Sequence, residues 1–177
     1  MERRVLVAGF GGQGVMVIGQ MIGQASWMAE KKVVYLPQYG PEQRGGTANC
    51  IVTISDEEIG SPVGRTVDAL IVLNDVSLKK YLPQVKTGGI VVVNSSICVD
   101  KVERTDVKVC YVAANAIARE IGNEKVANLV IIGAYIKNAG TLTENQIWEA
   151  VKVKLGKKAD LLELNRAALK KGIEAAN

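Results

Sequence analysis

The residues with the clearest capacity for chemistry form a glycine-rich turn, Gly-Phe-Gly-Gly-Gln-Gly, at positions 9–14. Its glycines have the spacing G-x-G-x-x-G. The apolar run 5–8 before the turn predicts a buried strand, and apolar residues at helical spacing follow over 15–29. A strand, a glycine turn and a helix in this order bring backbone N–H groups and a positive dipole end together, which favours an anion such as a phosphate. The candidate contacts are Gly9, Gly11, Gly12, Gln13 and Gly14.

A second loop, residues 38–46, carries polar side chains among glycines and is stiffened by Pro41. An arginine in such a loop, Arg44, can pair bidentately with a carboxylate or a phosphate. Because loops that follow parallel strands meet at one crevice, we expect this loop to face the glycine turn. The alternative is a solvated connection in which the arginine has no function. The candidate contacts are Tyr39, Glu42, Arg44 and Gly45.

A third polar cluster, Asn94 and Ser95 followed by Ser96, comes directly after the β-branched run 90–93. That run predicts a central strand, so the cluster is expected at the same sheet edge as the glycine turn. Asn94 and Ser95 are therefore candidate binding residues. As turn or helix-cap residues they need no such function, and that alternative stays open.

The elements that position these residues alternate along the chain between strand and helix patterns. This alternation predicts an α/β fold, a single doubly wound, mainly parallel sheet with helices on both faces and a Rossmann-like glycine turn after the first strand. We expect one domain, 1–177. The partial alternation of 47–55 predicts a half-buried strand, with an antiparallel position at the sheet edge as one option. Strands are expected at 5–8, 33–36 (stopped by Pro37), 47–55, 69–73, 90–93 and 107–112, and helices at 15–29, 75–82, 113–121, 126–138, 143–155 and 160–176.

Composition excludes several classes of function. The chain has 177 residues and a formal charge of +4, and its lysines and arginines do not cluster with aromatic residues, so no nucleic-acid footprint is present. No signal peptide and no membrane-spanning run is evident, and we expect a cytoplasmic protein that contacts neither nucleic acid nor membrane.

The chain contains no histidine, which removes the commonest general base and most zinc sites. Its three cysteines lie far apart without a C-x-x-C pair, so they predict buried thiols rather than a cluster or disulfide. Chemistry on this chain alone would have to come from carboxylates, lysines, tyrosines or a cofactor, and we assign neither a catalytic residue nor a metal ligand to it.

A dinucleotide is the usual ligand of a G-x-G-x-x-G turn, but the second strand argues against it here. That strand should end in a carboxylate that binds the ribose hydroxyls, and it ends instead in Leu36-Pro37-Gln38. A further alternative is that the glycines, Gly14 above all, only allow the first helix to pack closely on the sheet.

The two loops together carry a family resemblance. The turn 9–14, the loop 39–46 (Tyr-Gly-Pro-Glu-Gln-Arg-Gly-Gly) and Ile-Ser-Asp at 54–56 resemble the gamma subunit of 2-oxoacid:ferredoxin oxidoreductases, over essentially the whole chain. The segments 45–50 and 94–96 look most like subunits of the 2-oxoglutarate enzymes, with the pyruvate and branched-chain or aryl 2-oxoacid versions as relatives. Gln38 and Gln43 depart from residues common in those relatives.

The resemblance implies a reaction in which a 2-oxoacid, coenzyme A and oxidised ferredoxin give an acyl-CoA, carbon dioxide and reduced ferredoxin. Thiamine diphosphate, magnesium and iron–sulfur clusters are then expected on partner chains, namely thiamine-binding alpha and beta subunits and a ferredoxin-like delta subunit. This chain, inactive alone and a candidate homodimer when isolated, would support assembly and help to hold coenzyme A. Arg44, Gly11, Gly12 and Gln13 are the first candidates for that contact.

Two other functions stay open at this point. One is a stand-alone Rossmann-like protein that binds a dinucleotide, which the missing carboxylate disfavours. The other is a purely structural assembly subunit whose glycine loops are interface surface and bind no ligand.

Overall fold

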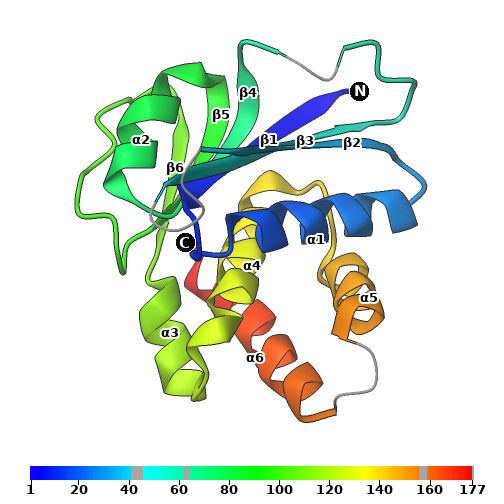
Figure 1. Cartoon of the computed structure of the whole chain (residues 1–177), viewed down its shortest axis with the longest axis vertical. Coiled ribbons are helices and arrows are strands. Elements are labelled where there is room, and N and C mark those ends of the chain that lie inside the picture. The colour runs from blue at the N-terminus through cyan, green and yellow to red at the C-terminus, as the bar shows by residue number, and fades with distance from the viewer. Residues whose placement is uncertain (41–45, 62–63, 156–158, 177) are drawn as a thin grey trace.

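The computed structural model describes residues 1–40, 46–61, 64–155 and 159–176. In this part of the chain, six strands form one sheet in the order β2-β3-β1-β4-β5-β6 (Figure 1). β1, β4, β5 and β6 are mutually parallel, whereas β3 is antiparallel to both of its neighbours. The predicted α/β class with a mainly parallel sheet is confirmed. The strands are β1 (Arg3–Phe10), β2 (Lys32–Tyr39), β3 (Thr47–Ser55), β4 (Val67–Val72), β5 (Val85–Asn94) and β6 (Lys108–Val112).

Two details of the strand prediction were wrong. β3 is antiparallel as expected, but it lies between β2 and β1 rather than at the sheet edge, and most of its residues are buried. Pro37 does not stop β2, which continues to Tyr39 and pairs Pro37 with Cys50 of β3. A proline is tolerated there because β2 is an edge strand, whose outer side has no partner strand that needs its missing N–H.

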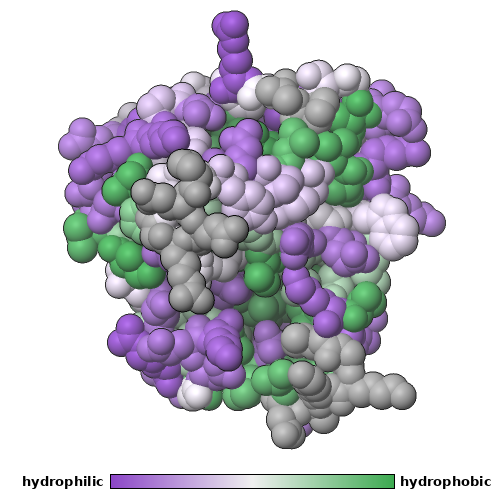
Figure 2. Space-filling model, viewed as in Figure 1, coloured by the Kyte–Doolittle hydropathy of each residue, from purple (hydrophilic) through white to green (hydrophobic). Residues whose placement is uncertain are grey.

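Helices cover the two faces of the sheet unequally. α1, α3, α4, α5 and α6 lie on one face, and α2 alone covers the parallel strands on the other (Figure 1). On the outside, Figure 2 shows hydrophilic side chains over much of the viewed face, with apolar patches between them. The helices are α1 (Val15–Met28), α2 (Asp75–Tyr81), α3 (Ala114–Ile121), α4 (Ala127–Ala139), α5 (Glu144–Leu155) and α6 (Ala159–Ala175), with short 3-10 helices η1 (Leu82–Gln84) and η2 (Glu124–Val126).

The two hydrophobic clusters follow from strand alternation. Val5 and Val7 of β1 face the five-helix side, while Leu6 and Ala8 face α2. α4 is the central helix of the larger cluster, and all of its residues from 129 to 136 are buried. A helix that is apolar all round is one that lies inside a core.

α4 packs against α6 through backbone contacts at two glycines. A Cβ on Gly172 would lie 2.1 Å from the carbonyl oxygen of Val130, and one on Gly133 would lie 2.4 Å from that of Leu169. Only glycine permits so close an approach, and this contact fixes α4, whose first turn reaches the candidate site.

Two local signals in the sequence are confirmed at helix ends. Gly140 ends α4 with a φ of 61°, the left-handed conformation that glycine adopts without cost. Thr143 and Gln146 form a reciprocal capping box before α5, with N-to-side-chain distances of 2.9 and 3.2 Å. None of the described helices is long and apolar enough to cross a membrane.

Candidate functional site

A cavity of about 460 Å³ opens at the carboxyl edge of the parallel strands. It lies beside the boundary between β1 and β4. From β1 the chain continues to β2 on one side of the sheet, and from β4 it continues to β5 and β6 on the other side. Such a switch point is where open α/β sheets bind ligands, and the volume is within the usual range for a ligand site. The cavity is lined by Gly12, Gln13, Gly14, Val17, Leu73, Asn94, Ile97, Asn115, Glu124, Lys125, Ala127, Asn128 and Ile131.

The glycine turn forms one wall of the cavity and presents the start of α1 to it. Gly12 and Gly14 have φ values of 94° and 87°, which L side chains rarely adopt. Gly14 is the N-cap of α1, and no described side chain caps this end. The first turn of α1 also lacks an acidic residue, so its N–H groups and positive dipole end are available to an anion.

Three glycines of the motif have roles within the protein. A Cβ on Gly9 would lie 2.8 Å from Gln13 Oε1 and 3.0 Å from Leu73 Cβ. The N–H of Gly11 donates to the carbonyl of Gly46 at 3.0 Å. A Cβ on Gly14 would lie 2.3 Å from Asn128 Oδ1. Gly9 and Gly11 do not line the cavity, and close packing accounts for Gly9.

Gln13 lines the cavity, but its side chain is bound to neighbouring loops. Its Oε1 accepts from the backbone N–H of Phe10 at 2.7 Å and from Asn74 Nδ2 at 2.9 Å. Its Nε2 donates to the carbonyl of Leu73 at 3.2 Å. The side chain therefore joins the glycine turn to the segment between β4 and α2.

Asn94 reaches the cavity from the end of β5, at the edge where the sequence placed it. It is buried, and its Nδ2 donates to Asn115 Oδ1 at 2.8 Å. Ser95 is exposed and does not line the cavity. Ser96 has the capping role that the sequence left open, because its Oγ accepts from the N–H groups of Asn115 and Ala116 in the first turn of α3.

The far wall of the cavity comes from η2 and the first turn of α4. Glu124 is paired with Arg119 at 2.8 Å, whereas Lys125 has no acidic partner among the described residues. The carboxamide of Asn128 lies against Gly14 and likewise has no hydrogen-bond partner in the described part of the chain. The ammonium of Lys125 and the carboxamide of Asn128 thus line the same cavity as the uncapped start of α1.

The second predicted loop is described only at its ends. Glu42, Arg44 and Gly45 lie outside the described residues. Tyr39 is 70% exposed at the end of β2 and does not line the cavity. The expectation that this loop meets the glycine turn is confirmed at Gly46, through its hydrogen bond to the turn.

Sequence reasoning missed four polar residues of the cavity, Asn115, Glu124, Lys125 and Asn128. None belongs to a motif, and each lies more than 100 positions after the turn. Their only sequence signal is their place near the start of the predicted helices 113–121 and 126–138, because helix starts in an α/β fold gather at the carboxyl edge of the sheet.

The cysteines do not contribute a nucleophile. All three are buried free thiols, as predicted. Burial raises the pKa of Cys50 and of Cys98 to about 12, so both are protonated at neutral pH. The described residues also contain no group of three or more histidine, cysteine, aspartate or glutamate side chains arranged to hold a metal ion.

Fold and cavity together define an α/β domain with a cavity at the switch point of its sheet. The model of the pyruvate ferredoxin/flavodoxin oxidoreductase family matches residues 4–175, and the chain belongs to this family. The resemblance noted in the two loops is thereby confirmed.

Relatives with different substrates in their names match almost all of the chain. It is 38% identical over 176 residues to ketoisovalerate oxidoreductase subunit VorA of Methanothermobacter thermautotrophicus, covering 99% of this chain and 36% of that protein. It is 33% identical over 179 residues to 2-oxoglutarate synthase subunit KorC of Methanocaldococcus jannaschii, covering 99% and 95%. The chain thus spans about a third of the first relative and nearly all of the second.

Solved structures share the fold. The gamma subunit of a keto/oxoacid ferredoxin oxidoreductase from Geobacter sulfurreducens has a TM-score of 0.83 and 31% identity, with 98% of each chain covered. The 2-oxoglutarate:ferredoxin oxidoreductase of Magnetococcus marinus, solved with 2-oxoglutarate, coenzyme A and succinyl-CoA bound, has a TM-score of 0.89 and 25% identity, covering 99% of this chain and 31% of that one.

Proposed function

We propose that the chain is the gamma component of a 2-oxoacid:ferredoxin oxidoreductase, and that its cavity binds the phosphate-bearing part of coenzyme A. The observation that carries this proposal is the uncapped start of α1 facing a cavity that also holds Lys125. A relative in the same fold was solved with coenzyme A bound, which supports the choice of ligand.

The cavity residues suit such a ligand. Phosphate oxygens would accept hydrogen bonds from the first-turn N–H groups of α1 and would pair with the ammonium of Lys125. Asn128 would add a neutral polar contact, while Ile97 and Ile131 supply apolar walls. The predicted site residues that line the cavity are Gly12, Gln13, Gly14 and Asn94. Those that do not line it are Gly9, Gly11 and Ser95. Tyr39, Glu42, Arg44 and Gly45 remain proposed contacts from the second loop.

This chain's own part in the reaction is to bind and orient. Thiamine diphosphate with magnesium and the iron–sulfur clusters would reside on alpha, beta and ferredoxin-like delta chains, where they supply decarboxylation and electron transfer to ferredoxin. Among the described residues, no group of three or more histidine, cysteine, aspartate or glutamate side chains is arranged to hold a metal ion. The thiol of coenzyme A would have to reach a partner's site while its phosphates are held here.

We propose 2-oxoglutarate as the substrate, with ketoisovalerate as the second candidate. The first choice rests on the two segments that resemble the 2-oxoglutarate enzymes and on the match to nearly the full length of KorC. The second rests on the 38% identity to VorA. Reduction of ferredoxin by the assembled complex, measured with each 2-oxoacid in turn, separates them.

The coenzyme A site is tested in that complex, purified from its own cells so that the co-purifying chains are identified by mass spectrometry. Lys125→Met should raise KM for coenzyme A about tenfold, since it removes a charge-assisted contact. Lys137→Met, at the other end of α4, is the matched control and should leave KM unchanged. Equal values of KM for both variants and the wild type would favour a purely structural subunit.

The dinucleotide alternative has less support. β2 ends in Gln38 and Tyr39, so the described part of its carboxyl end offers no carboxylate to a ribose.

A further inference from the structure

We propose that Gln13 is a positioning residue, which holds the glycine turn in the shape that binds the ligand and does not itself contact the ligand. This inference rests on the proposed function for the identity of the ligand. Its physical basis is the set of contacts that the Gln13 carboxamide makes inside the protein.

Both acceptor positions of Gln13 Oε1 are used, one by the N–H of Phe10 and one by Asn74 Nδ2, at 2.7 and 2.9 Å. The Nε2 group donates to the Leu73 carbonyl at 3.2 Å. A carboxamide oxygen has two lone pairs, so Gln13 retains no acceptor for a ligand. Three of the four hydrogen-bonding positions of this side chain join parts of the protein to one another.

These contacts extend the pairing of β1 with β4 into the loops beyond the two strands, where the N–H of Leu73 already donates to the carbonyl of Ala8 at 3.0 Å. Phe10 ends β1, Leu73 follows β4, and Asn74 caps α2 by accepting from the N–H of Ser77 at 2.8 Å. The Gln13 side chain therefore ties the turn after β1 to the start of α2. Loops between elements are otherwise the most mobile parts of a fold.

The first glycine of the motif makes this arrangement sterically feasible. A Cβ at Gly9 would lie 2.8 Å from Gln13 Oε1, inside normal contact distance. Gly9 and Gln13 thus act as a pair, in which the missing side chain of one makes room for the carboxamide of the other.

Fixing this turn matters because its glycines are free to adopt many conformations. Gly12 and Gly14 have positive φ values, and together they set the direction of the N–H groups at the start of α1. Without the Gln13 contacts, a ligand would have to order the turn when it binds, which weakens binding without changing the later chemistry. The predicted signature is therefore a change in KM rather than in kcat.

The test uses the assembled complex and Gln13→Met, which keeps the length of the side chain and removes its hydrogen bonds. We expect KM for coenzyme A to rise about tenfold, with kcat within about twofold of the wild type. Gln20→Met, an exposed glutamine on α1, is the matched control and should leave both constants unchanged.

A second variant protects the test if Gln13→Met does not fold. Asn74→Ser retains a side chain that caps helices but is too short to reach Gln13, so α2 keeps its cap. It should raise KM for coenzyme A in the same direction by a smaller factor. In the double variant the two effects should be less than multiplicative, because both remove the same connection.

The outcomes separate this inference from the proposed function. If Lys125→Met raises KM but Gln13→Met and Asn74→Ser do not, the positioning role is overturned and the coenzyme A site stands. A lower melting temperature of Gln13→Met with unchanged KM also overturns it, since that is the signature of a purely structural residue. If none of the three variants changes KM, the proposed site and this inference both fail.

Discussion

The two edges of the parallel strands use different polar chemistry. The carboxyl edge, around the cavity, holds the carboxamides of Gln13, Asn74, Asn94, Asn115 and Asn128. The amino edge holds ion pairs, among them Lys86–Asp68 at 2.7 Å and Arg104–Asp106 at 2.6 Å.

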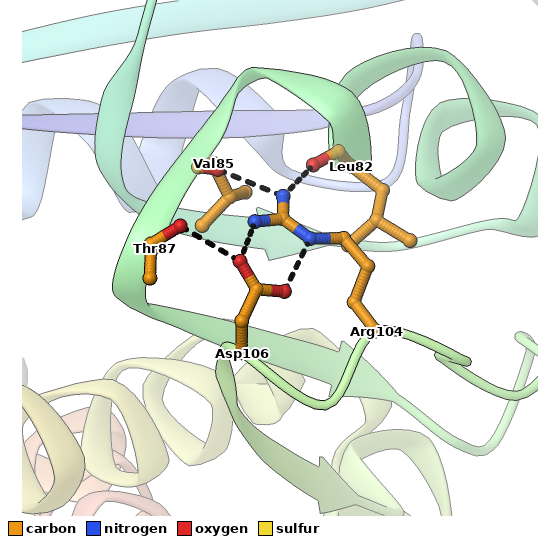
Figure 3. A network of polar contacts seen from close by, with 5 residues as sticks. All are labelled: Leu82, Val85, Thr87, Arg104 and Asp106. Atoms are coloured by element: carbon orange, nitrogen blue, oxygen red, sulfur yellow. Dashed lines mark hydrogen bonds and ion pairs between the residues drawn. The ribbon is translucent and has the colours of Figure 1, made fainter.

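The polar groups of the Arg104 cluster at the amino edge bind one another (Figure 3). The cluster consists of Leu82, Val85, Thr87, Arg104 and Asp106. The guanidinium binds both carboxylate oxygens of Asp106 and donates to the carbonyls of Leu82 and Val85 at 2.9 and 2.8 Å. Thr87 Oγ1 donates to the same carboxylate at 2.9 Å. These contacts tie the entries to β5 and β6 together, and the charges neutralise each other.

The cavity differs from the Arg104 cluster. Its hydrogen bonds hold the wall in place, but some polar side chains that line it have no partner among the described residues. Neutral amides hold the loops at the start of α1, and the carboxylate of Glu124 in the far wall is paired with Arg119. Lys125 and Asn128 remain without described partners. We infer that the amino edge stabilises the sheet and the carboxyl edge binds the ligand, a division common in parallel α/β folds.

The largest expected effect comes from Gly14→Ala at the cavity. A side chain there would adopt a positive φ and collide with Asn128, and we expect a loss of about 3 kcal/mol in the free energy of unfolding. Chemical denaturation measures it. Gly12→Ala, which has a similar φ but open space around it, should cost only about 1 kcal/mol. Equal losses for the two variants would contradict the position of Asn128.

Arg104→Met at the amino edge should have a smaller effect on stability and none on the ligand. It removes the hydrogen bonds to Leu82, Val85 and Asp106, so the melting temperature should fall by less than it does for Gly14→Ala. KM for coenzyme A should stay at the wild-type value in the assembled complex. A raised KM would show that the two edges are not independent.

The smallest expected effect is a pH dependence of the melting temperature that arises from Asp106 at the amino edge. Hydrogen bonds from Arg104 and Thr87 hold the pKa of Asp106 far below its usual 3.8. A carboxyl whose folded-state pKa is lowered stabilises the fold above its unfolded pKa and loses that contribution as the pH falls through the folded one. Melting temperatures should therefore decline as the pH drops below about 4, and Asp106→Asn should decline less. Parallel profiles for both proteins would contradict this assignment.

Local patterns in the sequence predicted most of the elements and the sheet edge at which the cavity lies. Gly140 and Thr143 marked helix ends correctly because caps depend on neighbouring residues. The predicted edge position of β3 was wrong because strand order depends on contacts between distant segments, here Val7 with Cys50. Asn128 escaped prediction for the same reason, since only the packing of α4 brings it to Gly14.

The division between the two edges is tested most directly by hydrogen–deuterium exchange of the assembled complex with and without coenzyme A. Added coenzyme A should slow exchange in peptides covering 11–17 and 124–131, which contain residues that line the cavity. It should leave 82–106 unchanged apart from the segment 94–97, in which Asn94 and Ile97 line the cavity. Protection near Arg104 and Asp106 with none at the start of α1 would contradict the account.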